Sequence, residues 1–232
     1  MRTYLVPDQE KHLDDIYATM KQRPVLPARG NEKLKVILSG PGNATERALT
    51  SWKHLLDSIG SPNLEYLSMT SPSDLFGHYQ GSKLTIDQIV ARASLYEKAG
   101  VPFGYDLAHS MRPWISEEAI RRSAEAAPKM FRFVYIAEDL ENFYSPLYKD
   151  MLKWMDRILA LCVKYNLKMV LKEKHDDWGL MPADPEIAGI LFRPEYKNVI
   201  FPIWSTNQPY QPEVELGGML GLKESGLCNE FG

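Results

Sequence analysis

Short β-rich runs alternate with helix-like stretches along most of this chain, and this alternation constrains the fold more than any other feature of the sequence. The β-rich runs cover residues 34–38, 64–69, 101–107, 131–136, 168–171 and 198–203. The stretches between them repeat apolar residues at helical spacing, as Leu49, Trp52 and Leu56 illustrate. A strand–helix repeat of roughly 25 to 35 residues is typical of a parallel sheet covered by helices.

Signals for helix starts support the same division. Three of them precede apolar periodic stretches: Asn43 with Glu46, Thr85 with Gln88, and Ser145 followed by Pro146. The first two pairs have the spacing of a capping box, and the third places proline at the first helical position. A seventh strand is expected to begin at residues 227–230.

Two architectures can arrange such units, a barrel and a doubly wound sheet. A doubly wound sheet usually carries a glycine-rich phosphate turn after its first strand. Here the turn reads Ser39-Gly40-Pro41-Gly42, and Pro41 removes a backbone N–H. The sequence therefore favours an α/β fold, a (β/α)8 barrel of the TIM type, truncated after about six βα units and the start of strand seven. Residues 1–33 are expected to form an N-terminal lead-in, and residues 34–232 an incomplete barrel catalytic domain.

Composition argues against several classes of protein. The formal net charge is −3 and no basic stripe occurs, so nucleic acid is not an expected partner. No apolar run is long enough to span a membrane, and the first thirty residues lack the apolar core of a signal peptide. The two cysteines, Cys162 and Cys228, have no zinc-site spacing, and Cys162 falls on the apolar face of a predicted helix. We expect no metal and no cofactor.

Polar side chains follow the predicted strands, whereas the strands themselves are apolar. Because parallel strands direct their carboxyl ends to one rim of a barrel, these side chains are expected to meet there. The candidate substrate-binding residues are Asp106, His109, Asp139, Glu173, His175, Asp177, Trp178 and Trp204. Carboxylates beside aromatic rings suit glycoside hydrolysis, in which one carboxyl gives a proton to the leaving oxygen and another stays ionised.

Glu138 is the candidate general acid. It directly follows an apolar strand, where desolvation would favour the protonated carboxyl. A pair of Glu138 and Glu230, on the fourth and seventh strands, would instead have the arrangement of many retaining glycosidases. Two other functions stay open at this point: a carbohydrate-binding barrel without catalysis, and a metal-dependent barrel hydrolase or isomerase that uses the acids and histidines of the rim.

Several short motifs in about the last hundred residues resemble one known family. They are FRFVYIAED at residues 131–139, Ser145-Pro146, Asp177-Trp178, Asp184-Pro185, Arg193-Pro194-Glu195-Tyr196, and Glu213 with Leu216-Gly217 before Ser225-Gly226. In this order they resemble the catalytic barrel of glycoside hydrolase family 98, endo-β-galactosidases that act on blood-group-type glycans. The first 130 residues match that family only in their strand–helix rhythm.

The resemblance implies a role for particular residues. The family's general acid falls on Glu138, in a Y-x-A-E arrangement that begins at Tyr135. The family inverts configuration with a pair of acidic residues as the base, and the matching position after the sixth strand is Gln211, so Glu213 becomes the candidate base. The second member of that pair would lie beyond Gly232.

The resemblance also implies a wider setting for the chain. It implies a carbohydrate substrate that contains galactose and an extracellular or periplasmic location. It further implies a longer parent chain that supplies the remainder of the barrel and accessory domains.

Overall fold

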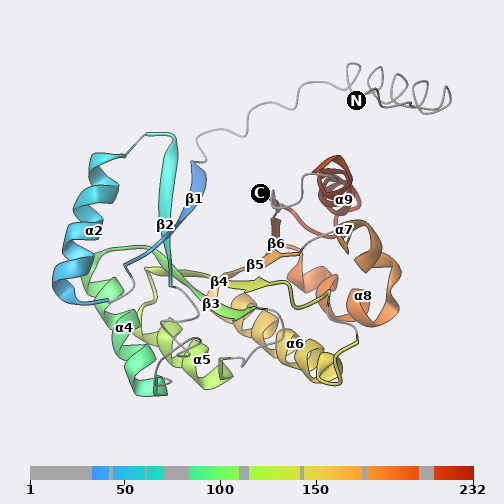
Figure 1. Ribbon diagram of the computed structural model, residues 1–232, viewed down its shortest axis with the longest axis horizontal. Coiled ribbons are helices and arrows are strands. Elements are labelled where there is room, and N and C mark those ends of the chain that lie inside the picture. Colours follow the sequence, from blue (N-terminus) through green and yellow to red (C-terminus); the bar gives the residue numbers. More distant parts are fainter. Residues whose placement is uncertain are drawn as a thin grey trace, which may run out of the picture.

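The chain folds as a curled sheet with helices on its outer side (Figure 1). The structure, a computed structural model, describes residues 33–41, 44–60, 62–70, 84–109, 115–141, 144–173, 177–203 and 212–232. Its strands are β1 (Leu34–Ser39), β2 (Leu64–Thr70), β3 (Phe103–His109), β4 (Phe131–Ala137), β5 (Lys168–Lys172) and β6 (Ile200–Ile203). Its helices are α2 (Glu46–Ser58), α4 (Ile86–Ala99), α5 (Glu117–Ala126), α6 (Tyr148–Tyr165), α7 (Asp177–Leu180), α8 (Pro185–Leu191) and α9 (Pro212–Glu224), with short 3-10 turns at Met181–Ala183 and Pro194–Tyr196.

The six strands are all parallel and lie side by side in chain order, from β1 to β6. A doubly wound sheet would reverse its strand order at a switch point, and this sheet does not. Its strands instead curl in one direction into half of a barrel, as Figure 1 shows. The expected (β/α) barrel architecture is confirmed, and the sheet does not close within the described residues.

The two faces of the sheet bury different side chains because side chains alternate along a strand. Phe103, Tyr105 and Leu107 of β3 face the helices and belong to the large core between sheet and helices. Gly104 and Asp106 therefore face the inner, concave side. There Leu67, Phe133 and Val170 form a separate buried cluster, against which Ile37, Met69, Tyr135, Phe201 and Ile203 pack.

The helix boundaries follow the sequence signals in part. Thr85 and Gln88 form the expected capping box at the start of α4. At α2, however, the N-cap is Thr45, whose hydroxyl accepts a hydrogen bond from the Ala48 N–H. Helix α6 begins at Tyr148, later than Ser145 and Pro146 predicted, because Ser145 uses its hydroxyl and carbonyl to form a turn with the next residues.

The C-terminal segment does not form the predicted seventh strand. Residues 227–232 have no strand geometry, although the Asn229 N–H donates to the Lys197 carbonyl and the Gly232 N–H donates to the Pro202 carbonyl. The segment therefore lies along β6 without extending the ladder. In the part of the chain that is described, no helix has the length and apolar character that a bilayer crossing requires.

Candidate active site

Four buried carboxylates lie on three neighbouring strands or directly after them. Asp106 is 4% exposed, Glu138 is 7% exposed, and Asp139 and Glu173 are fully buried. No other acidic residue in the described ranges is buried. Burying a carboxylate is costly unless charges or hydrogen bonds compensate it, so a cluster of four is a candidate functional site.

The register of the strands brings these residues together. Asp106 of β3 is paired with Tyr135 of β4, and Ala137 of β4 is paired with Lys172 of β5. Glu138 and Glu173 each directly follow their strand, and Asp106, midway along β3, lies level with Tyr135, two residues before the end of β4. The order of the strands along the chain thus assembles residues that are far apart in sequence.

Glu138 occupies a strained position in the backbone. Its φ is 59°, in the left-handed region, which costs a residue other than glycine roughly 1 to 2 kcal/mol. Its N–H donates to the Lys172 carbonyl at 2.8 Å, and its Oε1 lies 3.6 Å from the Lys172 Nζ. Strained residues that the surrounding structure holds in place are typical of functional sites.

The loop after Glu138 is also anchored. The Tyr148 hydroxyl, at the start of α6, donates to the Leu140 carbonyl at 3.3 Å. Leu140 is fully buried in the core between sheet and helices. Glu138 and Asp139 therefore lie between a strand and a fixed residue, which limits how far their backbone can move.

The electrostatics of Asp106 and Tyr135 reflect this crowding of acids. Burial, with the Asp139 carboxylate as the second cause, raises the pKa of Asp106 to about 8, and the Lys172 ammonium opposes this. Among the described residues, no hydrogen-bond partner reaches the Oδ1 atom of Asp106. Burial also raises the pKa of Tyr135, and the carboxylates of Asp106, Glu138 and Glu173 raise it further. The raised pKa of Asp106 favours its protonated form near neutral pH.

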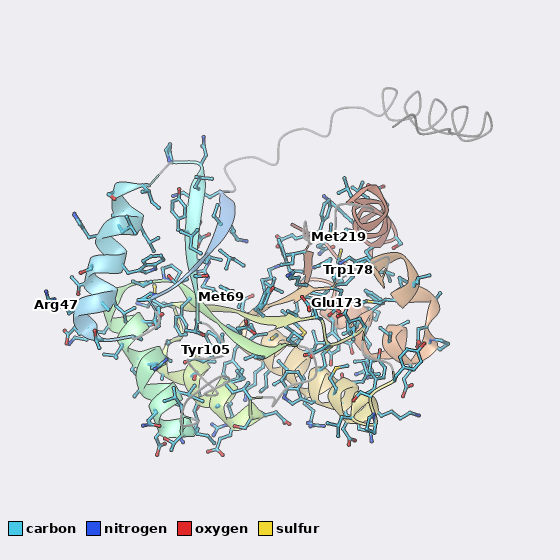
Figure 2. All side chains as sticks on the ribbon, viewed as in Figure 1. Arg47, Met69, Tyr105, Glu173, Trp178 and Met219 are labelled. Carbon is cyan, nitrogen blue, oxygen red and sulfur yellow. The ribbon has the colours of Figure 1, made fainter. Side chains whose placement is uncertain are left out.

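Trp178 does not lie where a sugar-stacking residue should. It is 1% exposed and belongs to the core, on α7 directly behind the rim. Helix α9 approaches it so closely that a Cβ on Gly218 would lie 2.9 Å from the Trp178 Cβ. Figure 2 shows Trp178 between Glu173 and Met219 of α9. The expected stacking role is corrected to a packing role, because neither face of the indole is open to a ligand.

Glu230 lies at the other end of the sheet from Glu138. Its Oε2 is 2.9 Å from the Nζ of Lys168, the first residue of β5, whereas Glu138 contacts Lys172, the last. Lys172 lies four residues after Lys168 along the strand, a length of roughly 13 Å. A retaining pair needs carboxyls about 5–5.5 Å apart. The alternative pair of Glu138 and Glu230 is therefore corrected: the structure does not bring these carboxyls together.

The remaining predicted residues have backbone positions only, or lie outside the described residues. His109 ends β3, Asp177 begins α7 and Glu213 is in the first turn of α9, but their side chains are not described. His175 and Trp204 lie outside the described residues. No group of three or more metal-binding side chains occurs within the described ranges.

Sequence reasoning missed two members of the cluster, Lys172 and Tyr135. No sequence motif singles out Lys172, and Tyr135 enters only as the start of the Y-x-A-E arrangement. A signal was present in the alternation of side chains: Lys172 shares the inner face of β5 with Val170, and Tyr135 shares that of β4 with Phe133. A polar residue at the last inward position of a barrel strand is a candidate for the rim.

The sequence matches no protein-family model and no curated protein. Its fold, by contrast, is similar to solved catalytic modules of family 98 glycoside hydrolases from Streptococcus pneumoniae TIGR4. One is in complex with the H-disaccharide blood group antigen, at a TM-score of 0.63 and 15% identity, and one is in its native form, at 0.62 and 16%. Each alignment covers 87% of this chain and 37% of the other, so this chain spans just over a third of the length of those modules. At this identity the similarity establishes the fold alone, which is like that of the family 98 catalytic modules.

Proposed function

We propose that this protein is a glycoside hydrolase that cleaves glycosidic bonds by carboxylate acid/base catalysis, with Glu138 as the general acid. The observation that carries the proposal is the concentration of buried carboxylates at one rim of the half-barrel. Barrel enzymes place their chemistry at this rim. Glycoside hydrolysis is the reaction class that needs several carboxyl groups in different protonation states at one site.

The position of Glu138 supports this role. Its carboxyl is largely shielded from water, and it lies beside Lys172, a cation that can stabilise the carboxylate left after proton transfer. The buried Asp106, whose raised pKa favours its protonated form near neutral pH, supplies a hydrogen-bond donor to the same cluster. Glu213 in the first turn of α9, the helix that follows β6, is our candidate for the base that activates water.

For the substrate we propose glycans that contain galactose. The similarity of the fold to a module solved with a blood group disaccharide supports this choice. The cluster contains four acidic residues and one lysine, so it is better suited to neutral glycans than to sialylated or sulfated ones.

The first prediction tests this function through Glu138. The purified protein is assayed for release of reducing ends from neutral galactose-containing glycans, with and without the change Glu138→Gln. We expect kcat to fall by about 100-fold or more, because loss of a general acid typically removes 10²–10⁴-fold of rate. Substrates with highly acidic leaving groups should lose less, since they need less protonation.

The matched control is Glu118→Gln, which changes an exposed glutamate on the outer helix α5. It should keep full activity and the same unfolding midpoint. Glycan binding without any cleavage by the unmodified protein would favour the alternative of a carbohydrate-binding barrel. Cleavage that Glu138→Gln leaves unchanged would contradict the role of Glu138.

A further inference from the structure

We propose that Lys172 is a positioning residue for Glu138, which it holds at two points, with its backbone carbonyl and with its side-chain ammonium. The inference rests on the proposed function, because it concerns how the proposed acid is oriented. It adds to that function a residue for which the sequence alone gave no role.

The backbone contact fixes the position of the Glu138 backbone. The Glu138 N–H donates to the Lys172 carbonyl, and this bond completes the pairing of Ala137 with Lys172 that ends the ladder between β4 and β5. It does so where the chain turns into the left-handed region, at φ 59°. The bond therefore stabilises a conformation that glutamate alone disfavours.

The side-chain contact fixes where the carboxyl of Glu138 points. Lys172 lies on the inner face of β5, two residues after Val170, so its side chain enters the site from the neighbouring strand. Its Nζ lies 3.6 Å from the Glu138 Oε1, and both side chains are largely shielded from solvent. Screening is weak at such a position, so the attraction is stronger than in a surface ion pair.

The surrounding charges make Lys172 important to the whole cluster. Glu138 and Asp106 face the Lys172 ammonium. The Asp139 carboxylate acts on Asp106, and the carboxylates of Asp106, Glu138 and Glu173 act on Tyr135. The Lys172 ammonium stabilises the ionised forms of both Glu138 and Asp106. When Glu138 gives its proton to a leaving oxygen, a cation is thus already in place beside the new carboxylate.

The decisive variant is Lys172→Met. It keeps the backbone carbonyl and most of the side-chain volume, and it removes only the ammonium. We expect kcat to fall by about tenfold with little change in KM, because the acid is present but less well oriented. The limb of the pH–rate profile set by Glu138 should also move to higher pH by about one unit or more, since a nearby cation lowers a carboxyl pKa by that amount.

The conservative variant Lys172→Arg separates positioning from a merely structural role. It keeps the charge, so its pH limb should return close to that of the unmodified protein even if kcat recovers only in part. A purely structural residue would lower activity and stability in both variants and would leave the limb in place. An unshifted limb in Lys172→Met would overturn the inference.

A second measurement does not require turnover. Carboxyl ¹³C NMR should show Glu138 and Asp106 titrating at higher pH in Lys172→Met than in the unmodified protein. In the unmodified protein the Cε resonance of Lys172 should respond to the Glu138 titration, and this response should vanish in Glu138→Gln. This measurement tests the pair of Lys172 and Glu138 even if Lys172→Met does not fold. Absence of the Lys172 response in the unmodified protein would contradict the inference. Absence of glycosidase activity would count against the proposed function alone.

Discussion

Asp106 shows how a single residue in this cluster links charge to stability. In the folded protein, burial and the Asp139 carboxylate raise its pKa to about 8 from an ordinary value of 3.8. A carboxyl whose pKa is raised on folding contributes stability that is fully present below its unfolded pKa. That contribution is lost as the pH rises towards the folded value. The unmodified protein should therefore lose stability from this group between about pH 4 and pH 8.

The change Asp106→Asn tests this linkage, because asparagine resembles the protonated acid and cannot ionise. At pH 8 the variant should be more stable than the unmodified protein by about 3 kcal/mol or more, and near pH 4 the two should be similar. Urea unfolding at both pH values measures the difference. The control Asp57→Asn changes an exposed aspartate on α2, and its effect should be small at both pH values. A gain for Asp106→Asn that is equal at both pH values would contradict the assigned pKa.

At this scale the sequence identifies acids better than it identifies their partners. Glu138 and Glu173 stand out because each directly follows a strand, and Asp139 comes next to Glu138, so position along the chain is enough to place them on a rim. The alternation along β4 and β5 shows which residues share a face with Tyr135 and Lys172, but which acids these two meet depends on the register of β4 against its neighbours. Register is a property of pairs of strands, so one strand read alone does not reveal it.

Among the elements, α7 and α9 pack closely against one another behind the site. Gly218 of α9 has no side chain, and an added Cβ would lie 2.8 Å from the Gly179 N atom and 2.9 Å from the Trp178 Cβ. Gly217, its neighbour on the same helix, has open space around it. Substitutions at the two glycines can therefore distinguish a packing requirement from the intrinsic cost of glycine in a helix.

We expect Gly218→Ala to lower the free energy of unfolding by about 2 kcal/mol, because the backbone of α7 cannot yield as a flexible side chain would. Gly217→Ala should raise it by about 0.5–1 kcal/mol, since alanine favours the helix. Thermal and urea unfolding of both variants measure this contrast. If both Gly218→Ala and Gly217→Ala stabilised the protein, α9 would not pack on α7 in this way.

The existence and order of the elements were predictable, whereas some of their boundaries were not. Strand periodicity and the capping box of Thr85 indicate six strand–helix repeats, and the structure contains them. The start of α6 was predicted too early because Ser145-Pro146 has the composition of a helix start, and in this protein the same two residues form the preceding turn. Local composition does not distinguish a cap from a turn that leads to one.

For the molecule as a whole, the parallel arrangement gives the sheet two chemically different ends. The buried acids lie directly after β4 and β5 and midway along β3, and Figure 2 shows Glu173 near Trp178 of α7. The opposite end of β5 carries Lys168, which binds Glu230 of the C-terminal segment. The sequence prediction placed Glu230 with the catalytic acids, although a residue at the start of a parallel strand lies at the amino end of the sheet.

This division of the molecule predicts that Glu230 holds the C-terminal segment and takes no part in catalysis. Glu230→Gln should change kcat by less than about twofold, whereas Glu138→Gln should lower it by about 100-fold. The variant should lose about 1 kcal/mol or less of unfolding free energy, because its pair with Lys168 is partly exposed and screened. Assays at low and high salt should show that this small loss shrinks as salt rises. A large fall in kcat with unchanged stability would contradict this prediction. It would mean that Glu230 reaches the reacting sugar in spite of the separation between the two ends of β5.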